Sequence, residues 1–323
     1  AIAFSPISPN NALLVVYPLC IMSYQKTPLT TRLQRIFRLI ACVLQAGKTL
    51  KNLPDNTSQA ERDRTLANIS QNVLHALNIH LIVDTPPSPT PTQGALVVAN
   101  HVSWLDIFAI STLCPSSFIA KQEIKTWPII GRIVMNAGTV FINRENRKDI
   151  DTTNQAIAQA LKQGQSVSFF PEARTSLGET VLPFKAALFQ AAIDAQMPVQ
   201  AIALRYYNHH NERTTAPSFA EVNLLVSLWR VVSEPQLHIR LDFAPCILPD
   251  QQDRFALKDQ AEQFISQKVL ADKKTQEWWS TCSLSHSIVS YRSNHQIAFY
   301  NEKYLNNKLY KSHYLLLNTP IPS

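Results

Sequence analysis

The sequence has few charges, few glycines and no apolar run long enough to cross a bilayer. Only 16% of its residues are charged, whereas an average soluble domain has roughly 25%. The best apolar candidate, ALLVVYPLCIM at 12–22, is too short and contains Pro18; no basic residue precedes its apolar run and no cleavage site follows it. We therefore expect neither a membrane-spanning helix nor a secretory signal. The thin polar cover suits a protein that rests on a lipid surface.

Paired cysteines are also missing. The chain has five single cysteines: Cys20, Cys42, Cys114, Cys246 and Cys282. They form no CxxC pair, and no histidine lies at zinc-finger spacing from them, so we expect no metal site. Scattered cysteines of this kind are typical of reduced, buried thiols in a cytosolic protein.

Acidic residues are absent before Asp55, although the same segment carries basic residues. Those basic residues are Lys26, Arg32, Arg35, Arg38, Lys48 and Lys51. In TRLQRIFRLIACVLQA at 31–46, apolar residues recur at helical spacing and arginines flank the stripe, which predicts a cationic amphipathic helix. It either lies in an anionic lipid interface or packs on the domain surface. Nucleic-acid binding has little support, because we find no reader motif and the basic residues share the stripe with apolar ones.

Strand-like and helix-like patterns alternate along most of the chain. Predicted strands span 79–83, 95–99, 117–121, 139–143, 166–170, 199–206 and 236–243. Helical patterns lie at 31–46 and 66–77, and then near 105–113, 150–163, 184–196 and 253–270. This alternation predicts an α/β fold with a largely parallel mixed sheet flanked by helices. We divide the chain into an N-terminal membrane-associating segment at 1–58, an α/β domain at 59–280 and a polar tail at 281–323.

NHVSWLD at 100–106 places a histidine five positions before an aspartate. His101 would follow a strand, at the sheet edge where α/β proteins bind ligands, and Asp106 would lie in the first turn of a helix. From there Asp106 can hold one imidazole nitrogen and leave the other free to take a proton. The same string is also typical of a loop histidine beside a helix-capping carboxylate, and by itself it favours that reading. If the pair is catalytic, the nucleophile would be a hydroxyl of the substrate.

Three later stretches favour a catalytic site. GTVFINR at 138–144 ends a strand in Arg144, which can grip a phosphate through two hydrogen bonds. SFFPEARTS at 168–176 delivers Glu172 and Arg174 to the same edge, either to orient a substrate or as a structural ion pair. MPVQAIALRY at 197–206 is either core or the wall of an acyl-chain slot.

In this order and spacing, these blocks resemble the glycerolipid acyltransferase family, which includes the bacterial 1-acyl-sn-glycerol-3-phosphate acyltransferases. The resemblance covers about residues 60–250. It implies that His101 is a general base and that Asp106 orients it. It further implies a substrate-binding group made of Asn100, Phe141, Arg144, Pro171, Glu172, Arg174, Ser176 and Lys185.

The third and fourth blocks depart from the family pattern. Ala173 stands where the family has glycine, and we expect this position to need positive φ or a close approach to substrate, so its Cβ would lower activity. Ala201 stands where the fourth block usually has a second proline. VLPFKAALF, which contains Lys185, is more similar to the FPEGTTS subgroup, which also includes lyso-ornithine lipid acyltransferases.

The resemblance implies transfer of a fatty acyl group to the free hydroxyl of a lysophospholipid such as 1-acyl-sn-glycerol-3-phosphate. The donor would be acyl-CoA or acyl-ACP, with no cofactor and no metal, because the thioester is already activated. The partners would be the two substrates, acyl carrier protein and an anionic membrane surface. The protein would lie on the cytoplasmic face of that membrane. Two alternatives stay open: another lysolipid acceptor such as lyso-ornithine lipid, or a lipid-binding protein whose catalytic site is degenerate.

Overall fold

The computed structural model describes residues 27–54, 56–86, 94–121, 140–142, 147–284, 288–293 and 296–301. The chain divides into two compact units, one formed by Gln25–Ala271 and the other by Ala1–Tyr24 together with Asp272–Ser323. In the second unit, β8 (Ile288–Ser293) pairs antiparallel with β9 (Gln296–Asn301). Sequence patterns had assigned no element to that tail.

The larger unit is built around a seven-stranded sheet with the order β1-β7-β6-β2-β5-β3-β4. Its strands are β1 (Ile79–Thr85), β2 (Leu96–Ala99), β3 (Ser117–Lys121), β4 (Val140–Ile142), β5 (Val167–Phe169), β6 (Val199–Asn208) and β7 (Leu237–Phe243). Neighbouring strands from β6 to β4 are parallel, and β1 is parallel to β7. Only the pairing of β7 with β6 is antiparallel among these described strands. The predicted mixed, largely parallel sheet is therefore confirmed.

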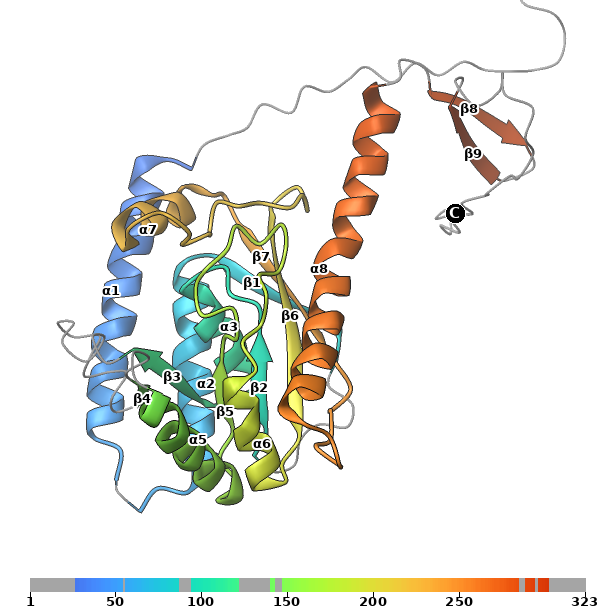
Figure 1. Cartoon of the computed structure of the whole chain (residues 1–323). Helices are drawn as coiled ribbons and strands as arrows, with labels where there is room; N and C mark the ends of the chain where they lie inside the picture. The colour runs from blue at the N-terminus through green and yellow to red at the C-terminus, as the bar shows by residue number, and fades with distance from the viewer. Residues whose placement is uncertain are drawn as a thin grey trace, which may run out of the picture. The chain divides into compact units, whose positions relative to one another are not determined.

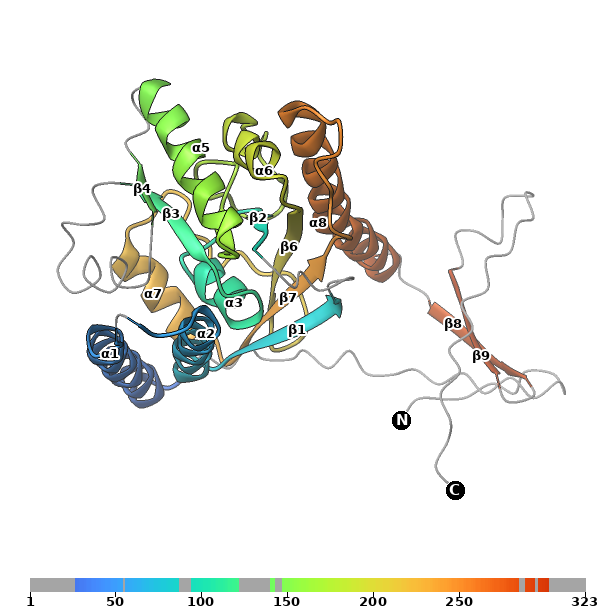
Figure 2. The ribbon, with the colours of Figure 1, turned by 90° about the horizontal axis from the view of Figure 1, so that it is seen from below.

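Helices cover both faces of this sheet (Figures 1 and 2). On one face lie α1 (Leu29–Lys51), α2 (Gln59–Ala76), α3 (Leu105–Leu113) and α7 (Leu224–Ser233). On the other lie α5 (Arg147–Lys162), the 3₁₀ turn η2 (Ala187–Phe189), α6 (Gln190–Ala195) and the first part of α8 (Arg254–Leu284). Each layer buries its own apolar cluster against the sheet, which gives the unit two cores.

Local sequence explains where several elements begin and lie. The central strand β2, LVVA, is buried on both faces, as the continuous apolar run of a covered parallel strand requires. Ser58 caps α2 by accepting a hydrogen bond from the Glu61 backbone N–H, a contact of the S-x-x-E capping pattern. Asn223 caps α7 by accepting one from the Val226 N–H.

The structure differs from several of the predicted helices. The predicted helix at 184–196 is split into η2 and α6, and the helix at 253–270 continues to Leu284. α7 was not predicted.

Among the described cysteines, Cys42, Cys114 and Cys246 form no disulfide and are only partly buried. The described helices include none that is both long and apolar enough to cross a bilayer.

Helix α1 packs on the domain and also exposes its apolar stripe. Arg35, expected to flank that stripe, is instead buried and donates hydrogen bonds to the carbonyl oxygens of Val232, Glu234 and Pro235 at the end of α7. The stripe itself stays outside: Leu29, Leu33, Phe37, Ile40 and Leu44 are all exposed.

Candidate active site

The central strand β2 ends at Ala99, and Asn100 fixes the junction between this strand and the loop that carries His101. Its side-chain Nδ2 donates to the Leu204 carbonyl oxygen at 3.0 Å, and its Oδ1 accepts the Leu204 N–H at 2.8 Å. Asn100 thus extends the β2–β6 ladder with a side chain, and it is buried. These two hydrogen bonds indicate that Asn100 positions the loop. Its contact with substrate stays a prediction. The loop is held at the carboxyl edge of the sheet.

Asp106, in the first turn of α3, holds the imidazole of His101. Its Oδ2 lies 2.9 Å from His101 Nδ1 and also accepts the N–H groups of Val102 at 2.7 Å and Ser103 at 2.9 Å. Its Oδ1 accepts the hydroxyl of Tyr206 at 2.6 Å. A carboxylate surrounded by these donors acts only as an acceptor, so His101 Nδ1 carries the proton. Nε2 is left with a free lone pair.

The His101 side chain is one-fifth exposed, whereas that of Asp106 is fully buried. Phe170 stacks on the imidazole, with ring centroids 3.9 Å apart and planes 8° from parallel. The ring orientation is therefore set by a buried carboxylate on one side and an aromatic face on another. This geometry matches the expected base and orienter; the catalytic roles of the two residues stay predictions.

Tyr206 was not selected from the sequence, although it lies in the block ALRY. It lies on β6, on the face of the sheet that α3 covers, where its hydroxyl reaches the buried Asp106 carboxylate. Burial raises the pKa of the Tyr206 hydroxyl well above its ordinary value, and the negative charge of Asp106 raises it further. The hydroxyl therefore stays protonated and serves as a donor. Every second residue along a strand faces the same layer, so Tyr206 shares the face of Ile202 and Leu204. This spacing is the signal that could have placed Tyr206 beside α3.

We expect Tyr206→Phe to lower acyl transfer by about tenfold and the free energy of unfolding by about 1–3 kcal/mol, because Asp106 Oδ1 loses its partner while buried. Tyr207→Phe is the matched control, since that hydroxyl is buried and has no hydrogen-bond partner among the described residues. Steady-state kinetics and denaturant titration of both variants measure the difference. Equal effects would show that the Tyr206 hydrogen bond has no positioning role.

The loop after β5 wraps around the His101 loop through Glu172. Its Oε1 accepts the His101 backbone N–H at 2.6 Å and its Oε2 accepts the Leu182 N–H at 2.8 Å. Burial raises the pKa of this carboxyl to about 7, against the opposing effect of those two donors. Because the folded state favours the protonated form of Glu172, this group adds to the free energy of unfolding at low pH. That contribution is lost as pH rises from 4.5 through about 7. Glu172 braces the loop, and its predicted contact with substrate stays a prediction.

Ser176 closes the same wrap from the other end. Its N–H donates to the His101 carbonyl oxygen at 2.8 Å, and its hydroxyl accepts the Gly178 N–H at 3.2 Å. Gly178 has φ +80°, and a Cβ there would lie 3.0 Å from a methyl carbon of Val102. Close packing of these two loops thus needs a glycine at this turn.

Ala173 adopts φ 61°, so the positive φ expected at this position is observed. An L-residue in the left-handed region is strained by its Cβ, which is why glycine suits the position. The lower activity expected from this alanine stays a prediction. The strain itself lies in the segment that holds His101 in place, directly after Glu172.

We expect Ala173→Gly to raise the free energy of unfolding by about 0.5–1 kcal/mol, because relief of left-handed strain exceeds the added entropy of the unfolded chain. Ala186→Gly is the control: Ala186 has φ −76° and gains nothing from glycine, so it should destabilise by a similar amount. Urea titrations of the two variants provide the comparison. Destabilisation by both substitutions would rule out strain at Ala173.

The other residues assigned to substrate take different places. Pro171 is buried, whereas Arg174 and Lys185 are exposed on the wrapped loop. The Lys185 N–H donates to the Pro171 carbonyl oxygen at 3.0 Å, which fixes the loop. Arg144 and the side chain of Phe141 lie outside the described residues, so their predicted roles are open.

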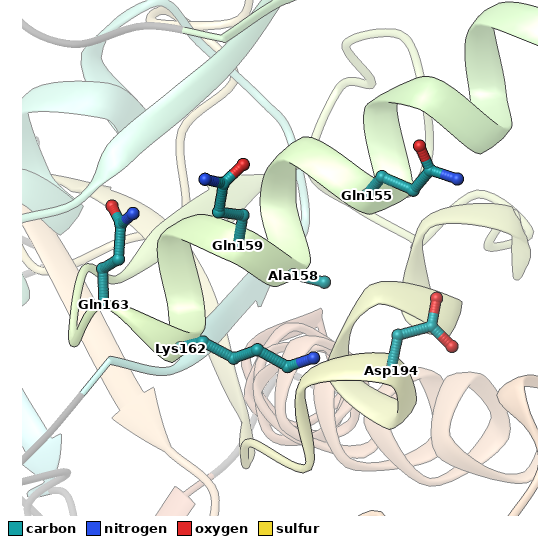
Figure 3. Close-up of a pocket in the computed structure, with 6 residues that line it drawn as sticks. All are labelled: Gln155, Ala158, Gln159, Lys162, Gln163 and Asp194. Atoms are coloured by element: carbon teal, nitrogen blue, oxygen red, sulfur yellow. The ribbon is translucent and has the colours of Figure 1, made fainter.

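A surface groove lies away from this site, between α5 and α6 (Figure 3). It is lined by Gln155, Ala158, Gln159, Lys162, Gln163 and Asp194. None of the predicted site residues contributes to it, and its helices cover the face of the sheet opposite α3. In the described part of the chain, no group of three or more histidine, cysteine or acidic side chains could hold a metal ion.

Comparison with known proteins identifies the family of the chain. The family model described as Acyltransferase matches residues 78–205. A 1-acyl-sn-glycerol-3-phosphate acyltransferase of Neisseria meningitidis serogroup B is 51% identical over 78% of this chain and 98% of its own length. A lyso-ornithine lipid O-acyltransferase of Pseudomonas aeruginosa is 34% identical over 54% of this chain and 67% of its own.

The crystal structure of a 1-acyl-sn-glycerophosphate acyltransferase from Thermotoga maritima has the same fold, with a TM-score of 0.59. It covers 76% of this chain and 95% of its own at 19% identity. The chain belongs to the glycerolipid acyltransferase family. The family expected from the four sequence blocks and the fold expected from the alternation of strands and helices are confirmed.

Proposed function

We propose that this enzyme transfers a fatty acyl group from a thioester to the free hydroxyl of 1-acyl-sn-glycerol-3-phosphate, which yields phosphatidic acid. The observation that carries the mechanism is the hydrogen bond from His101 Nδ1 to the buried Asp106 carboxylate, which leaves Nε2 as the proton acceptor. The 51% identical relative named for this acceptor supports the choice of substrate.

The chemistry balances with the residues at hand. His101 Nε2 takes the proton of the acceptor hydroxyl while its oxygen attacks the thioester carbonyl. The tetrahedral intermediate then collapses, the carbon–sulfur bond breaks, and the imidazolium returns its proton to the leaving thiolate. The products are the ester and a free thiol on coenzyme A or acyl carrier protein. Because the thioester is already activated, the reaction needs no cofactor and no metal.

Asp106 contributes by stabilising the imidazolium that forms when His101 takes the proton. Its negative charge is buried and held by two backbone amides and Tyr206, so it does not relax away during the reaction. Arg174 and Lys185, exposed on the loop that wraps His101, supply positive charge for the acceptor phosphate. Arg144 is proposed to contribute to the same phosphate.

The membrane would be met at its cytoplasmic face through α1, as a peripheral protein. The exposed apolar stripe of α1, together with its basic residues and lack of acids, supports this placement. Such a position would give His101 access to an acceptor that is itself a lipid.

The purified chain should be incubated with labelled acyl-CoA, or acyl-ACP, and a panel of lysophosphatidic acid and lyso-ornithine lipid. Transfer to lysophosphatidic acid supports the proposal. Preferred transfer to lyso-ornithine lipid would instead favour the activity named for the 34% identical relative. Vesicle binding without transfer to any acceptor would leave only a lipid-binding protein.

A further inference from the structure

Helix α7 presents large apolar side chains to solvent on one side. Leu225 is 76% exposed, Trp229 43% and Val226 40%, whereas Ser227, Val231 and Val232 on the other side are buried. Leu225 and Trp229 are four residues apart and so lie one helical turn from each other on the surface. Isolated exposed apolar residues are ordinary, but three on a ten-residue helix form a patch that calls for a partner.

This patch continues the exposed stripe of α1. The two helices lie side by side (Figures 1 and 2), and the Arg32 guanidinium stands 5.3 Å from the Trp229 ring centroid. The three hydrogen bonds from Arg35 to the end of α7 fix their relative position. We call the combined surface the two-helix face, and it consists of Leu29, Leu33, Phe37, Ile40, Leu44, Leu225, Val226 and Trp229.

The charges around the two-helix face select its partner. Arg38, Lys48 and Arg230 are exposed on the same two helices, and neither α1 nor α7 contains an acidic residue. Apolar side chains bordered by basic ones match the acyl boundary and headgroups of an anionic bilayer. A bilayer also accommodates two helices lying next to each other in its surface plane.

The buried side of α7 is joined to the catalytic loop. Trp104, between His101 and Asp106, donates its indole N–H to the Ser227 hydroxyl at 3.2 Å. In the segment before α7, the Phe219 N–H donates to the Val102 carbonyl oxygen at 2.9 Å. If the exposed side of α7 lies in lipid, its buried side therefore holds the His101 loop close to that lipid.

We propose that α7 is a second membrane-contacting helix, which together with α1 seats the enzyme on an anionic bilayer and holds the His101 loop at the lipid surface. The inference deepens the proposed membrane placement by adding a second element and a link to the site. Vesicle binding requires no acyl transfer, so this inference can fail while the proposed activity stands. A wild-type chain that binds vesicles without transferring acyl groups would contradict the activity alone.

The test is co-sedimentation of the full chain with vesicles of phosphatidylglycerol and phosphatidylcholine, in parallel with pure phosphatidylcholine. Leu225→Glu should weaken binding to the anionic vesicles by about tenfold or more. It removes apolar area that the bilayer would bury, and it adds a negative charge that the anionic lipids repel. Leu248→Glu is the matched control: Leu248 is 54% exposed but lies between β7 and α8, so its substitution should not change binding. Phe37→Glu tests α1 in the same way.

Loss of binding by Phe37→Glu with full binding by Leu225→Glu would confine the contact to α1 and overturn the inference. So would equal binding by both variants and the wild type, combined with a wild-type dimer that Leu225→Glu converts to a monomer. That second result would make the two-helix face an interface between copies of the chain. Turnover of a lysolipid presented in vesicles should fall with Leu225→Glu through a higher KM, whereas a short-chain monomeric acceptor should be used as well as by the wild type.

Discussion

Replacement of His101 by alanine is expected to lower acyl transfer by a factor on the order of 10² or more, as the loss of a general base implies. The hydroxyl of the acceptor would then have no neighbouring group to take its proton. Binding of both substrates should persist, because the loops around His101 are held by backbone contacts of Glu172 and Ser176 that alanine keeps. The effect should therefore fall on kcat more than on KM.

Stability should change little in the same variant. Asp106 keeps its hydrogen bonds from Val102, Ser103 and Tyr206 when the imidazole is removed. His209→Ala serves as control, because this histidine follows β6 in another loop and is also partly buried. Circular dichroism and thermal unfolding report the fold, and a radiolabelled acyl-transfer assay reports activity. Normal turnover by a folded His101→Ala enzyme would remove the mechanism.

Sequence patterns placed the sheet well because its strands are short apolar runs between turn residues. β2 and β6 read as strands from composition alone, and burial on both faces is what such runs require. The antiparallel pairing of β6 with β7 was not visible, because both strands have the same kind of pattern in either direction. Helix α7 was missed since LLVSLWRVVS is apolar over much of its surface and rich in valine; its signal was the Asn223 cap.

The site divides in the same way between local and distant contacts. His101 and Asp106 are five residues apart, so the strand–loop–helix pattern was enough to predict their hydrogen bond. Tyr206 reaches Asp106 from 100 residues away, through the register of β6 with β2. Glu172 was assigned to the substrate from the family resemblance, and that contact stays a prediction. The sequence does not show the two backbone N–H groups, of His101 and Leu182, that donate to its carboxylate.

Asp106→Asn should lower acyl transfer by about two to four orders of magnitude, although the fold should persist. An asparagine has only one acceptor oxygen, and it must face the three N–H donors that now share Oδ2. Its NH₂ group then points at Tyr206, whose hydroxyl can rotate from donor to acceptor. The hydrogen bonds are thus kept, and what is lost is the negative charge that stabilises the His101 imidazolium.

Because the two residues act as a unit, the double variant His101→Ala/Asp106→Asn should be no slower than His101→Ala alone. Tyr206→Phe in the Asp106→Asn background should add a large loss of stability, since the asparagine NH₂ would then be buried without an acceptor. Asp194→Asn, an exposed acid on α6, should leave activity unchanged and controls for the loss of a charge. If the losses of the single variants multiply in the double variant, Asp106 acts on the substrate independently of His101.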